Sequence, residues 1–374
     1  MYFERLMPLP VLSNILLILI IFWLLKPAIH KDEEIEPKRL YWGIGLVFLF
    51  CVFAFWNTDW FHYQYIFNDL KQAPDSNSHL EQIYIEIIKI CPTYLIFRVV
   101  VWGTALLLLY LTIRLLELNM SLTWFIFGVL FLLFFSYARI SLAMAMMIYG
   151  VALFFKPNQN YKLSFKILGI VFILSSIFFH KSALIGVIII LFSSVISVTN
   201  KNSWFYLIFC YCVACILIQI LLVKFTSGGI VLGEESLNES LINTNEYINR
   251  ESSIGIGAIG TNIRVFFERI TYFLMALLCY KLQNNYLLPK HIEIISKINL
   301  YLVIFACLFI IDYGFRTNIF YGRVLRFTLI PSSIILSYTI QHHLYSGFVK
   351  YIYGFALMGT ISALLYSFYV SIVT

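Results

Sequence analysis

Long apolar runs, separated by short polar stretches, recur along the chain from residue 9 to residue 372. A helix that crosses the hydrocarbon core of a bilayer needs about 20 mostly apolar residues, which is close to the length of these runs. The pattern predicts an all-α, polytopic membrane protein with about 12 transmembrane helices. The predicted spans are 9–26, 40–56, 94–114, 120–137, 139–155, 165–179, 182–198, 205–223, 270–283, 298–312, 327–344 and 349–372.

The composition supports this assignment. The chain has 374 residues, of which 61% are hydrophobic and only 12% are charged. A soluble domain has about 25% charged residues, so a water-soluble enzyme is excluded. No polar stretch is long enough to fold alone, and residues 1–374 are therefore expected to form a single integral membrane domain. The net charge of +7 is scattered through loops, so nucleic acid is not an expected partner.

Two polar segments are much longer than the others, at about 57–92 and 224–269. An even number of predicted spans separates them, so both face the same side of the membrane. The basic residues of the opposite side are mostly lysine, which favours that side as the cytoplasmic one and both termini as external. The predicted spans at 165–198 are interrupted only by His180 and Lys181, and they form either a hairpin or one broken, re-entrant element.

The first candidate for chemistry is an aromatic segment within the first long loop. Trp60 lies within it, and if the segment is helical, Asp59, His62 and Tyr63 share one face. Aromatic rings can cover the apolar face of a sugar while a carboxylate accepts hydrogen bonds from its hydroxyls. The alternative is an aromatic belt at the membrane interface, which is common in membrane proteins.

Further candidates stand at the ends of predicted spans. Arg139 and His180 each lie between apolar runs, while Arg323 and Arg326 precede a late span. Arginines gathered at a membrane surface suit a phosphate or diphosphate, which they bind through paired hydrogen bonds. The alternatives are a snorkelling arginine, a structural histidine and simple positive-inside anchoring. With alternating spans, one face collects Asp59, Glu81, Arg139, His180, Arg323 and Arg326.

Signatures of metal or nucleotide chemistry are missing from the sequence. It contains no P-loop lysine motif, no His-Glu-x-x-His and no Asp-x-Asp, so no metal and no cofactor is predicted. The glycines of residues 255–260 match a dinucleotide fingerprint by letter, but no strand–turn–helix unit accompanies them.

At these residues the chain resembles the Wzy/EpsG-like family of bacterial polysaccharide repeat-unit polymerases. One departure is Asn57, where the family usually has glycine two residues before the aspartate. The matching pieces are Asp59-x-x-x-Tyr63, Glu81-x-x-Tyr84, Arg139-Ile140-Ser141-Leu142-Ala143, His180-Lys181-Ser182-Ala183 and the Arg323/Arg326 stretch.

The resemblance implies a metal-independent, GT-C-like glycosyltransferase of the bacterial inner membrane, active on the periplasmic face. Its donor is a growing glycan on undecaprenyl diphosphate, and its acceptor is one lipid-linked repeat unit, as in O-antigen, capsule or exopolysaccharide synthesis. A chain-length regulator and a flippase of the same pathway are expected partners.

Within that scheme each candidate residue receives a role. His180 is the preferred general base because histidine titrates near the operating pH, with Asp59 and Glu81 as rivals. The diphosphates are assigned to Arg139, Arg323 and Arg326, and the further substrate-binding candidates are Trp60, Tyr63 and Tyr84.

Two other functions stay open from the sequence. A GT-C transferase that uses a lipid-monophosphate sugar would take Asp59 as its base and add single sugars. A flippase or another transporter would be expected to show inverted repeats and broken midplane helices. The chain shows no convincing repeat, and its polar residues gather at one surface.

Overall fold

The computed structural model describes residues 8–26, 36–53, 58–72, 81–131, 138–155, 163–180, 183–193, 255–313, 325 and 327–373. Within these ranges every regular element is a helix, which confirms the all-α prediction. The helices are α1 (Pro8–Leu25), α2 (Pro37–Phe53), α3 (Thr58–Gln72), α4 (Gln82–Ile90), α5 (Tyr94–Leu115), α6 (Met120–Phe125), the π-helical η1 (Ile126–Phe131), α7 (Ala138–Phe155), α8 (Leu163–Phe179), α9 (Ala183–Ser193), α12 (Gly255–Asn285), α13 (Lys290–Tyr313), α15 (Leu329–Gln341) and α16 (Ser346–Val373).

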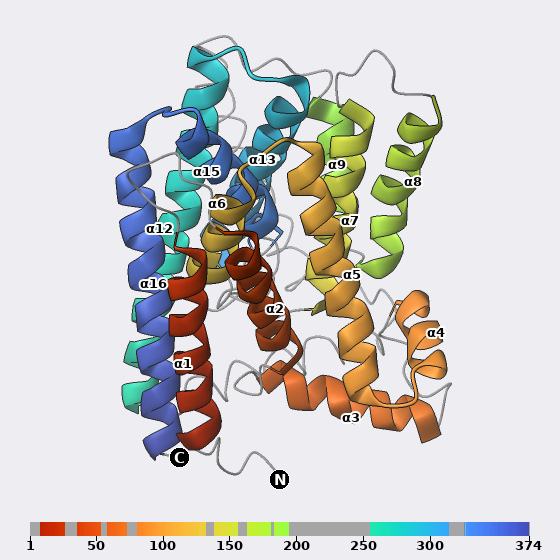
Figure 1. The fold of residues 1–374 in the computed structure, drawn as a ribbon, viewed down its shortest axis with the longest axis vertical. Coiled ribbons are helices and arrows are strands. Elements are labelled where there is room, and N and C mark those ends of the chain that lie inside the picture. Colours follow the sequence, from red (N-terminus) through yellow and green to blue (C-terminus); the bar gives the residue numbers. More distant parts are fainter. Residues whose placement is uncertain are drawn as a thin grey trace, which may run out of the picture.

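Most of the helices run roughly along the long axis of the molecule and alternate in direction (Figure 1). Helices α5, α7 and α12 run one way, and α8, α13 and α16 return. The short helix α3 lies across the bundle at its lower end, with α4 beside it (Figure 1). We call the part that holds α3, α4 and the adjoining ends of α5, α7 and α8 the α3 half. The opposite part is the lysine half, because it carries Lys166, Lys281, Lys290, Lys297 and Lys350.

The positions of the predicted spans agree closely with the helices. The run predicted at 94–114 is α5, and the last run, predicted at 349–372, lies within α16. Among the described residues, α5, with 22 residues, is the one helix both long and apolar enough to cross a membrane. Shorter apolar helices accompany it, so the number of crossings stays a prediction. The span predicted at 205–223 lies outside the described residues.

Two boundaries differ from the sequence expectations. The first long loop contains α3 and α4, because Ile66, Phe67 and Leu70 give it an apolar face that packs inward. The second long loop ends earlier than expected, since α12 begins at Gly255 and includes the glycine-rich stretch. The separately predicted segments 165–179 and 182–198 correspond to two helices, α8 and α9, which contact each other; residues 194–198 lie outside the described residues.

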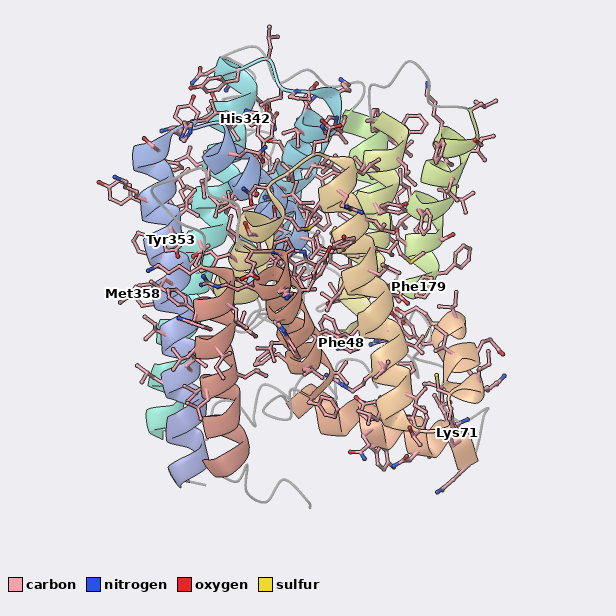
Figure 2. The ribbon with its side chains drawn as sticks, in the orientation of Figure 1. Phe48, Lys71, Phe179, His342, Tyr353 and Met358 are labelled. Atoms are coloured by element: carbon pink, nitrogen blue, oxygen red, sulfur yellow. The ribbon has the colours of Figure 1, made fainter. Side chains whose placement is uncertain are left out.

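Large apolar side chains are exposed around the outside of the bundle, as expected for a surface that faces lipid. These side chains come from helices on several sides of the molecule (Figure 2). Examples are Trp23 on α1, Leu107 on α5, Phe178 on α8, Phe273 on α12 and Tyr351 on α16, each more than half exposed.

Helices α7 and α8 pack with their backbones in close approach. A Cβ atom on Gly150 of α7 would lie 2.6 Å from the carbonyl oxygen of Gly169 on α8. Small residues allow such contacts between membrane helices. From this contact, Arg139 and His180 are each eleven residues away, or about 16 Å along two antiparallel helices. The glycine contact therefore sets Arg139 and His180 at the same level of the bundle.

Candidate functional site

An ion pair between Glu81 and Arg139 is the centre of the candidate site. Arg139 Nη1 lies 2.7 Å from Glu81 Oε2, and the two side chains are 20% and 9% exposed, respectively. Arg139 stands in the first turn of α7, where the positive end of the helix dipole disfavours a cation. Glu81, the N-cap residue of α4, supplies the opposite charge. The pair thus joins α4 to α7 across 58 positions of sequence.

Tyr84 supports Arg139 from a fully buried position. Its hydroxyl donates a hydrogen bond to the carbonyl oxygen of Arg139 over 3.3 Å, and the guanidinium carbon lies 5.9 Å from its ring centroid. The ring also makes edge-on contacts with Phe97 of α5 and Phe179 of α8. Tyr84 was predicted to bind substrate, but its ring is 0% exposed, so its contact with the site runs through Arg139.

His180 directly follows α8 and lies beside this cluster. Phe179, the preceding residue, packs against Tyr84 with ring centroids 5.7 Å apart (Phe179 is labelled in Figure 2). The backbone N–H of Ala183 donates to the His180 carbonyl over 2.8 Å, which closes the turn into α9. The partly exposed imidazole makes an edge-on contact with Phe327, at 5.4 Å between centroids. His180 and Arg139 are therefore linked through Tyr84 and Phe179.

The late arginines of the predicted set are not described. Arg323 and Arg326 lie outside the described residues. Phe327, however, directly follows Arg326 in sequence and touches the imidazole of His180. The backbone next to Arg326 is thus at the candidate site.

The aromatic segment of the first long loop continues into α3. The residues of this segment from Thr58 onward are therefore helical, as the predicted shared face of Asp59, His62 and Tyr63 requires. Asp59, Trp60 and Tyr63 belong to α3, and their side chains lie outside the described set. The helix lies in the α3 half, near Glu81, because α3 packs on α4 and α5.

One residue of this region was missed by sequence reasoning. Arg98 lies inside the apolar run of α5, and its side chain is buried, at 6% exposure. It donates hydrogen bonds to the carbonyl oxygens of Cys51 and Val52 at the end of α2. An arginine in an apolar run was the available signal, because a charge there needs polar partners.

Metal ligands do not gather in the part of the chain that the structure describes: no group of three or more His, Cys, Asp or Glu side chains is present there. The cluster that the structure does assemble consists of a carboxylate, a guanidinium, a phenol and an imidazole, contributed by Glu81, Arg139, Tyr84 and His180. These groups can bind an anion and exchange a proton.

The EpsG family model matches residues 39–373, which include every helix that contributes to this cluster. The chain belongs to the EpsG family. This is a Wzy/EpsG-like polysaccharide polymerase family, so the resemblance drawn from the motifs is confirmed. Membership identifies a membrane protein of polysaccharide biosynthesis and associates it with a glycosyltransferase-like polymerase activity. No curated protein and no solved structure matches the chain.

Proposed function

We propose that this EpsG-family protein polymerises oligosaccharide repeat units carried on undecaprenyl diphosphate, on the periplasmic face of the bacterial inner membrane. The observation that carries the proposal is the Glu81–Arg139 pair, 2.7 Å apart, beside the turn that holds His180. The Arg139 side chain is 20% exposed and His180 is partly exposed, so neither residue is sealed inside the bundle. In the proposal, a diphosphate bound at Arg139 places the reacting sugar beside the imidazole.

In the proposed reaction, a hydroxyl oxygen of the acceptor repeat unit attacks the anomeric carbon of the donor glycan. The bond from this carbon to the diphosphate oxygen breaks, and the diphosphate leaves with the bonding electrons. His180 accepts the hydroxyl proton, with Asp59 as the rival base. Arg139, Arg323 and Arg326 stabilise the charge that grows on the leaving group, a role that needs no metal.

The pairing of Glu81 shapes its part in this scheme. One of its carboxylate oxygens accepts a hydrogen bond from the Arg139 guanidinium over 2.7 Å, so the carboxylate fixes the direction of that side chain. We therefore propose that Glu81 orients Arg139. A bound diphosphate then competes with Glu81 for the same guanidinium.

The distribution of lysines supports the proposed side of the membrane. Five lysines lie in the half opposite the candidate site, whereas α3 and α4 carry two, Lys71 and Lys89, and short cytoplasmic loops are rich in Lys and Arg. This supports a cytoplasmic lysine half and a periplasmic α3 half.

The test is polymerisation by the purified protein in lipid nanodiscs, supplied only with undecaprenyl-diphosphate-linked repeat units. We expect a ladder of lengthening products on a gel, formed without nucleotide sugars and in the presence of EDTA. His180→Gln should abolish the ladder, whereas Lys166→Arg, in the lysine half, should preserve it.

Other product patterns would contradict the proposal. Addition of one sugar from a lipid monophosphate would indicate the rival transferase. Movement of intact lipid-linked oligosaccharide between leaflets, without new glycosidic bonds, would indicate a flippase. A full-length ladder from His180→Gln would exclude His180 as the base.

A further inference from the structure

Arg98 is a buried arginine whose guanidinium donates hydrogen bonds to two backbone carbonyl oxygens. Its Nε donates to the carbonyl oxygen of Val52 over 2.7 Å, and its Nη2 donates to the carbonyl oxygen of Cys51. Both carbonyls belong to the last turn of α2, where backbone oxygens have no partner within the helix. The positive charge also suits the negative end of the α2 dipole. Arg98 therefore caps α2 from another helix.

The same two turns of α5 also hold α3. Phe67 of α3 packs against Tyr94 and Phe97, with ring centroids 5.8 and 6.0 Å apart. Arg98 contacts Tyr94 as well, through its Nη1, 3.5 Å from the hydroxyl, and over its ring at 5.9 Å. We name Tyr94, Phe97 and Arg98 the α5 anchor. It fixes the end of α2 and the middle of α3 on one short stretch of α5.

The α5 anchor also reaches the candidate site. Phe97 packs edge-on against Tyr84, at 6.2 Å between centroids, and Tyr84 holds Arg139. Residues 54–57, which join α2 to α3, lie outside the described set, but both helices that they connect are attached to α5. The direction in which α3 leaves α2 is thus set from α5.

We infer that Arg98 is a positioning residue, which holds α2 and α3 so that the helix bearing Asp59, Trp60 and Tyr63 faces the sugar. The effect on sugar binding rests on the proposed function, while the effect on α3 does not. A guanidinium is required because three of its nitrogens donate in fixed directions to three acceptors. Lysine offers one ammonium on a flexible stem and cannot reach all three in the same geometry.

Hydrogen–deuterium exchange of the protein in nanodiscs tests the structural part without any activity assay. Arg98→Gln should speed amide exchange in the last turn of α2 and in α3 at least tenfold, and leave α15 and α16 unchanged. Arg98→Lys should give an intermediate acceleration. The matched control is Arg114→Gln at the other end of α5, where the guanidinium lies 5.5 Å from the Tyr110 ring. It should leave α2 and α3 unchanged.

The kinetic part uses lipid-linked repeat units. Arg98→Gln should raise the KM for the acceptor at least fivefold, with a smaller change in kcat, because the reacting groups of α7 and α8 stay in place. Unchanged exchange in α2 and α3, or equal acceleration in every helix, would overturn the positioning role. Faster exchange in α3 with an unaltered acceptor KM would overturn its link to sugar binding. If the wild type forms no polymer, the proposed function fails, and exchange still decides the role of Arg98.

Discussion

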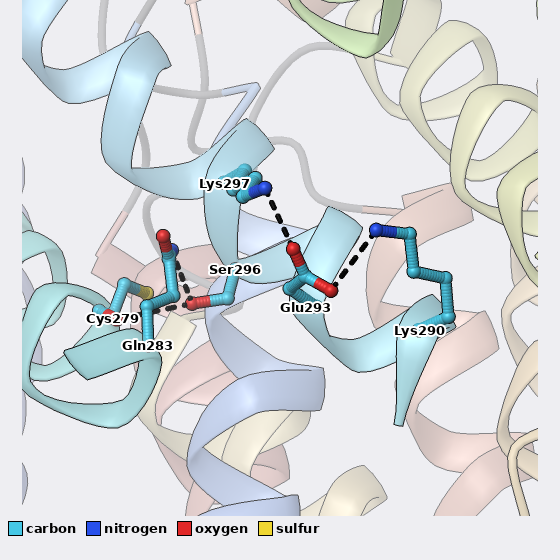
Figure 3. A network of polar contacts seen from close by, with 6 residues as sticks. All are labelled: Cys279, Gln283, Lys290, Glu293, Ser296 and Lys297. Atoms are coloured by element: carbon cyan, nitrogen blue, oxygen red, sulfur yellow. Dashed lines mark hydrogen bonds and ion pairs between the residues drawn. The ribbon is translucent and has the colours of Figure 1, made fainter. Parts of the chain in front are cut away.

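The two halves of the molecule each contain a carboxylate paired with basic side chains, but the pairs differ in how they are built. In the α3 half, Glu81 and Arg139 come from separate helices, 58 positions apart in sequence. In the lysine half, Glu293 pairs with Lys290 and Lys297, three and four positions away on the same helix (Figure 3). The first pair exists only when the bundle is folded, whereas the second needs only α13.

In the lysine half, the ion pairs of Glu293 lie within α13 and have a structural role. Lys297 Nζ lies 2.6 Å from Glu293, and Lys290 Nζ lies 3.2 Å from it. Close by, Gln283 of α12 donates to the hydroxyl of Ser296 over 3.0 Å, which ties α12 to α13 (Figure 3). An exposed pair at such helical spacing, as between Lys290 and Glu293, contributes about 0.3–0.5 kcal/mol, whereas the Lys297 side chain is buried. The network therefore stabilises the start of α13 and its contact with α12.

The comparison indicates where function resides. A pair that joins distant helices has a geometry that the whole fold must maintain, as a binding site requires. A pair within one helix can be exchanged for other helix-stabilising residues with little consequence. The following predictions change one half and use the other as the control.

The largest effect is expected at Arg139. Arg139→Lys keeps the positive charge but loses the paired hydrogen bonds that a guanidinium can donate to a diphosphate. Loss of a charge-assisted hydrogen bond of about 1.5–3 kcal/mol should slow polymerisation roughly ten- to hundredfold. The measurement is the initial rate of ladder formation at equal amounts of protein. Lys290→Arg, whose side chain is 51% exposed in the lysine half, is the matched control and should retain full activity.

Glu81→Gln sharpens this result in a double-mutant cycle. If Glu81 acts by orienting Arg139, adding Glu81→Gln to Arg139→Lys should cause little further loss, because the two effects are coupled. Independent losses that multiply would contradict the orienting role and favour Glu81 as a separate catalytic group.

The next effect concerns the contact between α7 and α8, which sets Arg139 and His180 at the same level of the bundle. Gly150→Ala places a Cβ atom 2.6 Å from the backbone oxygen of Gly169, which cannot move without shifting α8. We expect a loss of about 1–3 kcal/mol in the free energy of unfolding, together with reduced polymerisation. Thermal unfolding in detergent measures the first effect.

Gly354→Ala is the control for this substitution. Nothing lies within 4 Å of a Cβ atom at Gly354 of α16, and alanine favours a helix over glycine by about 0.8–1.0 kcal/mol. Its stability should be unchanged or raised. A Gly150→Ala variant as stable and active as Gly354→Ala would show that the α7–α8 contact is not a constraint.

The contrast also explains what the sequence could predict. Apolar runs located the helices well, because lipid and core burial impose long hydrophobic segments on every spanning helix. The pairing of Glu293 with Lys297 was readable from its four-residue spacing. The pairing of Glu81 with Arg139 was not, since only the motif order suggested that they lie on one face, and no spacing rule links distant helices.

Other features could not be predicted from the sequence, for physical reasons that the structure shows. Helices α3 and α4 are short and amphipathic, so a window suited to membrane spans reads them as loop. Arg98 bonds to carbonyl oxygens, which every residue carries, and such partners leave no mark on the sequence. The burial of Tyr84 depends on Phe97 and Phe179 from two other helices, and no spacing in the sequence indicates these contacts.

A smaller effect is expected at Tyr84. Tyr84→Phe keeps the buried ring and removes the hydroxyl that donates to the Arg139 carbonyl over 3.3 Å. A hydrogen bond of about 0.5–1.5 kcal/mol corresponds to a two- to tenfold loss in rate. Tyr345→Phe removes a comparable hydroxyl, 3.2 Å from the Lys281 carbonyl in the lysine half, and should leave the rate unaltered. Equal losses in both variants would indicate a general effect on stability.

The smallest effect is a pH dependence at Glu293, which precedes the predicted span 298–312. Partial burial alone would raise the pKa of its carboxyl, but hydrogen bonds and charges from Lys297 and Lys290 outweigh burial and hold the pKa below its ordinary value of 4.5. A carboxyl with a lowered pKa stabilises the fold above its unfolded-state pKa, and this contribution is lost as the pH falls through the folded-state value. Wild type should therefore exceed Glu293→Gln in unfolding free energy by less than about 1 kcal/mol at pH 7. The difference should shrink as the pH falls below 4.5, the carboxyl's ordinary pKa. Polymerisation at pH 7 should be the same for both proteins. A rate loss in Glu293→Gln as large as that in Arg139→Lys would remove the functional distinction between the two halves.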